Sequence, residues 1–447
     1  MTIANRPPAA GTDPDLGKRV FRIEGGQPLR GRVRIGGAKN AALPLLAATL
    51  LTPETVVLTN MPDLADISTM VEILSSLGAT VEWDRAANKV TVRAESIKTT
   101  SVPPQLVSKM RASFLVAGPL LARCGDVDAT TPGGCQLGAR PVDVDVRGFR
   151  RMGADVQFSD QTVSASTTKL RGARIFMDYP SHTGTENLIM AASLAEGKTT
   201  IVNASCEPEI VALGVMLNRM GARISGLGSP IVTVEGVDRL HGTSEAILPD
   251  RLEAGTYAIG AVITGGEVVI ENIRPHDMLP VSAKLQDAGA EIWINDDSML
   301  VRGGDRLTAV EVQTLPFPGF PTDLQSAFAV LMTQAHGTSK LHERVFEDRL
   351  RYTDELVKMG ADIRVERFGD RYGQRAEFTG PAPLHGTEVR ALDIRAGAGM
   401  VLAGLIADGV TTIRDVKHID RGYDGLVRKL RQLGARIEES HLPAGSA

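Results

Sequence analysis

Several features that would mark a nucleic-acid, membrane or disulfide-rich protein are missing from this sequence. Its charges nearly balance, with a formal net charge of -4, whereas nucleic-acid and membrane surfaces usually need a strongly basic face. The best apolar run, Ala41 to Leu51, falls short of the roughly 18 residues that span a bilayer and contains Pro44. Only three cysteines occur, Cys124, Cys135 and Cys206, and they form no CxxC pair. We therefore expect a cytoplasmic protein with neither a nucleic-acid nor a membrane partner.

Signatures of common cofactors and metals are missing as well. Neither the GxGxxG fingerprint of dinucleotide-binding proteins nor the GxxxxGK phosphate loop occurs. The histidines show no HxxxH or similar metal-binding spacing. These absences argue against a nicotinamide or flavin enzyme and predict no metal site.

The sequence does contain a repeat of about 70 residues. Six times an amphipathic stretch ends in a Gly-Ala pair that precedes a strand-like run, at Gly78, Gly153, Gly221, Gly289, Gly360 and Gly434. Each unit also has an Ala/Leu-rich helix that ends in a turn, as in LAEGKTTIVN, where Gly suits the left-handed position after a helix. Alternating helices and strands predict an α/β fold of six units, three in each of two domains, with a cleft between them. The alternative is six units stacked for stability alone, which composition does not exclude.

The loop between the strand and the second helix carries an arginine in three units. These are Arg140 in unit two, Arg349 in unit five and Arg421 in unit six. A single loop arginine is usually only solvated, but three at matching positions indicate a shared anion, because guanidinium groups bind carboxylate and phosphate with a rigid fork of donors. In IGGAKNAALPLL, Lys39 and Asn40 stand at a helix entrance that also favours an anion. Since these cations fall on two domains, we expect their repulsion to favour an open cleft until anions bind.

One cysteine and two aspartates are candidates for proton transfer or helix capping. Cys135 stands in the glycine-rich loop PGGCQLG, where nearby cations should lower its pKa. Cys124 and Cys206 fit the usual buried, inert cysteine. Asp323 follows the stiff sequence PGFP, which would aim its carboxylate into a cleft as a general base. Asp393 precedes a helix-like run, so capping that helix is its more natural role.

Together these segments resemble the UDP-N-acetylglucosamine enolpyruvyl transferase family. The resemblance runs from about Val20 to Glu439 and rests on GGAKNAALP, KMRAS, PGGCQLGARPVD, FPGFPTDLQ, VFEDR, DIRAGAG and HIDRGY in this order. It implies a two-domain fold of six βαβαββ repeats, an inside-out α/β barrel in each domain. It also implies a discontinuous division, with one domain from 20–39 plus 249–447 and the other from 40–248. Residues 1–19 and the end HLPAGSA are expected to be disordered tails.

The resemblance further implies a reaction with two small-molecule partners. The family transfers the enolpyruvyl group of phosphoenolpyruvate to the 3-hydroxyl of UDP-N-acetylglucosamine and releases phosphate, the first committed step of peptidoglycan precursor synthesis. Cys135, the thiol that fosfomycin alkylates, would protonate the methylene carbon, while Asp323 assists loss of the hydroxyl proton. A tetrahedral ketal then loses phosphate, and no metal or organic cofactor takes part.

The resemblance assigns binding roles residue by residue. The phosphate of phosphoenolpyruvate is assigned to Lys39, Arg140 and Arg421, and its carboxylate region to Arg349 and Arg395. The nucleotide sugar is assigned to Asn40, Arg111, Arg140, Pro141, Val142, Asp143, Val144, Ser181, Asp323 and Val345.

One segment departs from the family pattern. Residues 180–185 read PSHTGT where the family usually has PSVGAT against the uridine diphosphate, so His182 and Thr183 replace a small apolar pair. Tyr179 stands where relatives often have Lys. We interpret this as drift in a tolerant loop and expect UDP-N-acetylglucosamine to remain the acceptor. Two alternatives stay open, a related enzyme of secondary metabolism with another nucleotide acceptor and a non-catalytic regulator that binds the nucleotide sugar. Intact Lys39 and Cys135 argue against the second.

Overall fold

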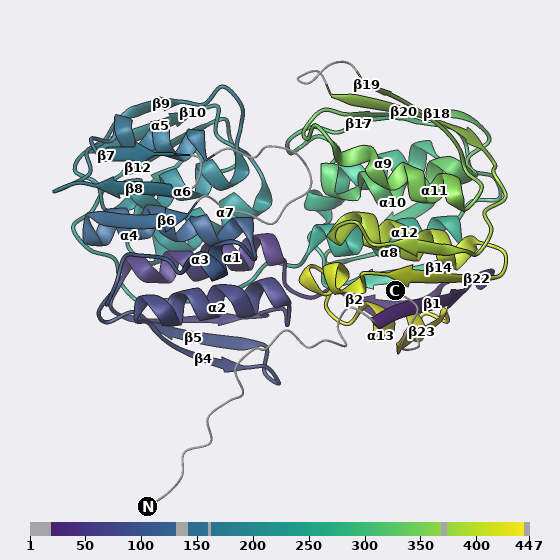
Figure 1. Cartoon of the computed structure of the whole chain (residues 1–447), viewed down its shortest axis with the longest axis horizontal. Helices are drawn as coiled ribbons and strands as arrows, with labels where there is room; N and C mark the ends of the chain where they lie inside the picture. The colour runs from purple at the N-terminus through teal and green to yellow at the C-terminus, as the bar shows by residue number, and fades with distance from the viewer. Residues whose placement is uncertain (1–18, 131–141, 160–161, 368–372, 442–447) are drawn as a thin grey trace, which may run out of the picture.

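The chain folds into two lobes joined by two crossing segments (Figure 1). The computed structural model describes residues 19–130, 142–159, 162–367 and 373–441. Cys135, Arg140 and Pro141, and all but one residue of each expected tail, lie outside these ranges. Arg19 and His441, which we assigned to the tails, pair instead with each other in strands β1 (Arg19–Glu24) and β23 (Arg436–His441).

Six βαβαββ repeats build the two lobes, three in each, as the sequence predicted. Among the described residues, five of the six sheets have four strands in the order first, second, fourth, third. The first pair is parallel and the other pairs are antiparallel, as in β2–β14–β16–β15. The sheet of the second repeat has three strands, and an isolated parallel bridge between Ser101 and Asp128 stands in place of its first strand.

Lobe 1 contains repeats one to three. Repeat one consists of β13 (Ser244–Ala246), α1 (Lys39–Ala48) with η1 (Thr49–Leu51), β3 (Thr55–Thr59), α2 (Ala65–Leu77), β4 (Thr80–Asp84) and β5 (Lys89–Arg93). Repeat two consists of α3 (Pro104–Val107), η2 (Arg111–Val116), α4 (Ala117–Cys124), β6 (Asp126–Thr130), α5 (Asp143–Arg151), β7 (Asp155–Phe158) and β8 (Thr162–Ser166). Repeat three consists of β9 (Arg174–Phe176), α6 (His182–Ser193), β10 (Lys198–Val202), α7 (Pro208–Arg219), β11 (Arg223–Ser225) and β12 (Ile231–Glu235).

Lobe 2 contains repeats four to six and takes two strands from the start of the chain. Repeat four consists of β2 (Arg30–Arg34), α8 (Arg251–Ile263), β14 (Glu267–Glu271), η3 (Pro275–Met278), α9 (Leu279–Asp287), β15 (Glu291–Ile294) and β16 (Ser298–Arg302). Repeat five consists of β17 (Glu311–Gln313), η4 (Thr322–Leu324), α10 (Gln325–Gln334), β18 (Gly337–Glu343), η5 (Arg349–Tyr352), α11 (Thr353–Lys358), β19 (Asp362–Arg367) and β20 (Gln374–Gly380). Repeat six consists of β21 (Glu388–Arg390), α12 (Ile394–Ile406), β22 (Val410–Arg414), η6 (Val416–Arg421), α13 (Leu426–Gln432), β23 and β1.

The first helices of the repeats are buried inside the lobes and the sheets lie outside, which is the inside-out arrangement that we expected. In lobe 2, α8, α10 and α12 pack against one another, and all but two of the 13 residues of α12 are buried. One apolar core spans Ala38 to Leu248, and the other combines Phe21–Ile35 with Leu252–Ile437. From these two cores we propose a domain division at about residues 37/38 and 248/249, two residues before the expected 39/40 boundary, because Ala38 belongs to the core of lobe 1 and Lys39 begins α1. Within the described ranges, no helix has both the length and the apolarity to cross a bilayer.

The two crossings between the lobes lie side by side. Gly37 and Pro249 form an antiparallel bridge, and the N–H of Ala38 donates to the carbonyl of Leu248 at 2.7 Å. Strands β1 and β2, purple in Figure 1, therefore lie among the green and yellow elements of lobe 2. Because α1 and α8 begin directly after these crossings, their first residues face the same space between the lobes.

The Gly-Ala turns explain where each second helix ends. All six glycines have positive φ, from 89° at Gly153 to 109° at Gly78. The N–H of the following alanine donates to a carbonyl five residues back, as from Ala79 to Leu74 at 3.0 Å, which is a Schellman-type helix end. The alanines are buried, so a larger side chain would meet the core. A local conformational requirement thus accounts for the repeat that the sequence displays.

Candidate active site between the lobes

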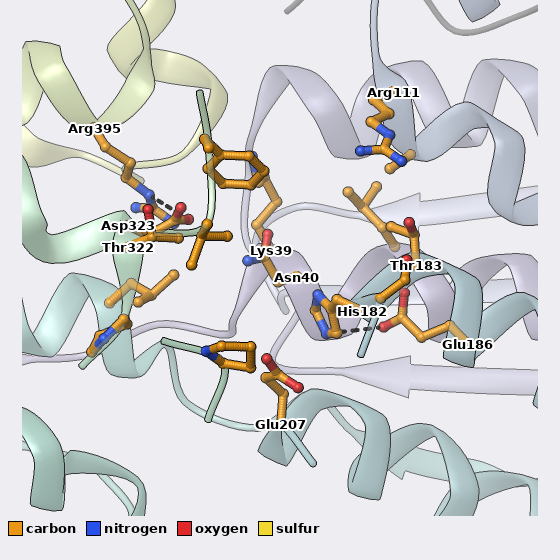
Figure 2. Close-up of a pocket in the computed structure, with 18 of the residues that line it drawn as sticks. Lys39, Asn40, Arg111, His182, Thr183, Glu186, Glu207, Thr322, Asp323 and Arg395 are labelled. Atoms are coloured by element: carbon orange, nitrogen blue, oxygen red, sulfur yellow. Dashed lines mark hydrogen bonds and ion pairs between the residues drawn. The ribbon is translucent and has the colours of Figure 1, made fainter. Parts of the chain in front are cut away.

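A cleft with a volume of about 1060 Å³ lies between the lobes and is lined by both. Helix starts open onto it, with Lys39 beginning α1, Arg111 beginning η2 and His182 beginning α6. From lobe 2, Asp323 precedes α10 and Arg395 stands in the first turn of α12. Figure 2 shows these side chains around the cleft. Since helix N-termini carry partial positive charge, their convergence favours an anionic ligand.

Asp66, in the first turn of α2, links two of the expected phosphate ligands. Its Oδ2 accepts from Nζ of Lys39 at 3.2 Å, and its Oδ1 accepts from Nε of Arg421 at 2.8 Å. Burial and the guanidinium groups of Arg395 and Arg421 lower the pKa of Lys39, while Asp66 opposes them. Arg421 comes from lobe 2, so this buried carboxylate joins the lobes. Our expectation of repelling cations overlooked Asp66, which lies between them.

Asp323 lies between two arginines expected near the carboxylate of phosphoenolpyruvate. Its Oδ1 accepts from Arg349 at 2.7 Å and its Oδ2 accepts from Nε of Arg395 at 3.2 Å. Burial alone would raise the pKa of Asp323, but Arg349, Arg395 and Lys39 hold it well below its usual range. Arg349 also donates to the hydroxyl of Thr322 at 3.1 Å. Asp323 is therefore ionised and firmly held in this arrangement.

Most of the described residues expected at the nucleotide sugar line the same cleft. Besides Asp323, they are Asn40, Arg111, Asp143, Val144, Ser181 and Val345. The hydroxyl of Ser181 caps α6 by accepting the N–H of Gly184 at 3.1 Å. Val142 differs, because it is absent from the cleft lining and its side chain is buried in the core of lobe 1. Of the described part of segment 140–144, only Asp143 and Val144 reach the cleft.

Asp393 and the remaining cysteines have other environments. The carboxylate of Asp393 accepts the N–H groups of Arg395 and Ala396 at 2.7 and 2.9 Å, so the capping role is confirmed. Our expectation that Cys124 is buried was wrong, because it is exposed at the last position of α4. Cys206 is half-buried. Partial desolvation raises the pKa of both thiols, which disfavours the reactive thiolate.

Sequence reasoning missed a second cluster of charges on the cleft wall. Glu186, Glu207 and Arg251 line the cleft beside His182, and Arg251 pairs with buried Glu209 at 3.0 Å. Burial raises the pKa of Glu186 to about 8, although His182 opposes this shift. The clustering arises from α6, α7 and α8, which are far apart in the sequence, so no single motif announces it.

Comparisons with known proteins point to one family of enzymes. A sequence profile of the family described as EPSP synthase (3-phosphoshikimate 1-carboxyvinyltransferase) matches residues 23–438. UDP-N-acetylglucosamine 1-carboxyvinyltransferase 2 of Carboxydothermus hydrogenoformans is 48% identical over 420 residues, which are 94% of this chain and 98% of that protein. UDP-N-acetylglucosamine 1-carboxyvinyltransferase 1 of Caldanaerobacter subterraneus is 46% identical over 420 residues, 94% of this chain and 99% of that protein. Among solved structures, the enolpyruvyl transferase NikO from Streptomyces tendae is similar with a TM-score of 0.86 and 26% identity, covering 96% of this chain and 100% of that one.

Proposed function

Because the chain belongs to the EPSP synthase family, and within it to the UDP-N-acetylglucosamine 1-carboxyvinyltransferases, we propose that it transfers the enolpyruvyl group of phosphoenolpyruvate to the 3-hydroxyl of UDP-N-acetylglucosamine. The observation that carries the proposal is the cleft, where Lys39, Arg349, Arg395 and Arg421 surround the carboxylates of Asp66 and Asp323. A small trianion such as phosphoenolpyruvate needs such a set of cations from several directions.

In the proposed complex, the phosphate takes over the cations that Asp66 now holds. Lys39 and Arg421 already converge on one carboxylate, so their donors are placed for a second oxygen anion. Arg140 is assigned to the same phosphate, but it lies outside the described residues. The carboxylate region of the substrate is assigned to Arg349 and Arg395.

Asp323 is proposed to take the proton of the sugar hydroxyl. With both carboxylate oxygens held by guanidinium groups, it is ionised but only weakly basic. A substrate carboxylate that shares Arg349 and Arg395 would weaken this hold and bring the pKa of Asp323 up toward the range of a useful general base. Substrate binding and base activation would then be one event.

The bond changes follow an addition and an elimination. The 3-oxygen bonds to the central carbon of phosphoenolpyruvate while Asp323 takes its proton and Cys135, outside the described residues, gives a proton to the methylene carbon. The tetrahedral product then loses phosphate from the central carbon and a proton from the methyl carbon, which leaves the enol ether. The chain's own part is to orient two anions and to move these protons.

The comparisons favour UDP-N-acetylglucosamine over another acceptor. The relatives of that name are 46 and 48% identical, whereas the transferase NikO is 26% identical. The product would serve peptidoglycan precursor synthesis, and a cytoplasmic location stays a prediction from cysteine usage.

Phosphate release tests the proposal directly. The protein would be mixed with phosphoenolpyruvate and each of a panel of UDP-sugars and free nucleotides. We expect release with UDP-N-acetylglucosamine to exceed that with UMP or UDP-glucose by a large factor in kcat/KM. Faster turnover with a free nucleotide would show that this nucleotide, and not UDP-N-acetylglucosamine, is the acceptor. No phosphate release with any acceptor would support the alternative of a non-catalytic regulator.

A further inference from the structure

Glu343, at the end of β18, has a fully buried carboxylate that the proposed reaction does not use. Its Oε2 accepts the hydroxyl of Thr322 at 2.7 Å, and its Oε1 accepts the N–H groups of Val345 and Phe346 at 2.7 and 3.0 Å. Burying a carboxylate is costly unless such donors satisfy both of its oxygens. The cleft lining formed by the described residues does not include Glu343, so any effect on the reaction must pass through these partners.

The hydroxyl of Thr322 connects Glu343 to Arg349. Its oxygen accepts from Nη1 of Arg349 at 3.1 Å, while its single proton is donated to Glu343. The direction of both bonds is determined, because a guanidinium group cannot accept and an ionised carboxylate cannot donate. The other terminal nitrogen, Nη2 of Arg349, donates to Oδ1 of Asp323 at 2.7 Å. Figure 2 shows Thr322 next to Asp323 at the cleft.

The other oxygen of Glu343 holds the loop that leads to Arg349. Val345 and Phe346, whose N–H groups bind Oε1, both line the cleft, and Val345 is assigned to the nucleotide sugar. The ring centre of Phe346 lies 5.0 Å from the guanidinium carbon of Arg349. One carboxylate therefore holds the loop at the acceptor through Oε1 and the arginine beside the proposed base through Oε2.

We propose that Glu343 is a positioning residue, which acts through the hydroxyl of Thr322 to hold Arg349 against Asp323 in the orientation that proton transfer from the sugar hydroxyl requires. The inference rests on the proposed function for the role of Asp323 as the base. With both terminal nitrogens bound, the guanidinium plane of Arg349 is fixed, and Asp323 is fixed with it. Such precision matters, because a displacement of about 1 Å at a reacting group can lower turnover by about a hundredfold.

Thr322→Val removes the hydroxyl and keeps the shape of the side chain. We expect kcat in the phosphate-release assay to fall by about tenfold or more. KM for the nucleotide sugar should stay within about twofold, because Glu343 keeps both bonds to the loop. Thr322→Ser retains the hydroxyl and should restore kcat to within about threefold of wild type. A loss in kcat alone that serine rescues is not the result of general destabilisation.

Glu343→Gln tests whether Glu343 acts through Thr322. The amide oxygen can still accept both N–H groups of the loop, but the amide nitrogen offers donors to a hydroxyl that needs an acceptor. We expect kcat to fall by about tenfold at an unchanged KM for the nucleotide sugar. If the effect passes through Thr322, the double variant with Thr322→Val should be no slower than Thr322→Val alone. Independent effects would instead multiply to about a hundredfold.

Thr100→Val is the matched control, because it removes a hydroxyl that donates to the carboxylate of Asp126 at 2.6 Å outside the cleft lining. It should leave kcat and KM within about twofold of wild type. Wild-type kcat in Thr322→Val, or losses that multiply in the double variant, would overturn the inference.

Two further outcomes are informative. If Glu343→Gln does not fold, the comparison at Thr322 decides alone, and equal kcat values in the valine and serine variants would overturn the inference. No phosphate release by the wild-type enzyme with any acceptor would refute the proposed function itself, and with it the base that Glu343 is inferred to position.

Discussion

Replacing Asp66 by Asn tests whether this buried carboxylate holds the phosphate ligands and the lobes together. The substitution keeps the shape of the side chain but removes the charge between Lys39 and Arg421. Contacts of 3.2 and 2.8 Å correspond to Coulomb energies of about 5–6 kcal/mol each at an effective dielectric constant of about 20. Hydration lost by the ions offsets much of this, and Arg421 is 25% exposed. We therefore expect a loss of about 3 kcal/mol, the lower end for a broken buried pair.

Urea unfolding measures this loss as a lower midpoint concentration of urea, while the dependence of the unfolding free energy on urea concentration stays the same. Asp63→Asn is the control, because Asp63 pairs with Arg85 at the surface, and it should change the free energy of unfolding by less than about 0.5 kcal/mol. A functional readout distinguishes the charge from general destabilisation. Inorganic phosphate should bind Asp66→Asn about tenfold more tightly than wild type, because two cations then lack their carboxylate. An unchanged unfolding midpoint together with unchanged phosphate affinity would refute the reasoning.

Three further predictions concern the thiol, the base and the buried glutamate. Fosfomycin should modify Cys135 and spare Cys124 and Cys206, as peptide mapping would show, and an adduct on either of the latter would contradict this. Asp323→Asn should lower kcat by about 10²-fold or more in the phosphate-release assay, and retention of most activity would exclude the base role. Since the pKa of Glu186 is raised from 4.5 to about 8, the folded state binds more protons than the unfolded state in this window, and stability falls as the pH rises through it. Glu186→Gln should thus raise the melting temperature at pH 8 but not at pH 4.5. An equal change in melting temperature at both pH values would argue against the raised pKa of Glu186.

The fold was predictable where the signal is local. A glycine with positive φ must end each second helix, and a small residue must follow it into the core, so the Gly-Ala pairs mark the repeats in the sequence. The discontinuous course of the chain, which starts in lobe 2, forms lobe 1 and then returns, has no such local signal. Strand β2 pairs with β14, more than 200 residues away, and only the resemblance to a family indicated this.

The candidate site was predictable in part for the same reason. Arginines at matching loop positions suggested an anion, but the acidic residues of the other loops were overlooked. Asp66, Glu209 and Asp277 each stand twelve residues before the glycine of their Gly-Ala turn, close to where the three arginines stand in their units. All three are buried. The repeat therefore contained a signal for Asp66 that attention to cations alone did not use.

The sequence by itself determined the six repeats, the helix ends and the residue types available to bind an anion, because turn conformation and periodicity depend on neighbouring residues. Only the tertiary structure decided which charges meet. Asp66 and Arg421 are 355 positions apart and come from different lobes, and their pairing depends on how the lobes lie against each other. Likewise, the pKa of Glu186 depends on burial by α6, α7 and α8 together. Burial and long-range pairing set the electrostatics of the cleft, and neither is a property of any one segment.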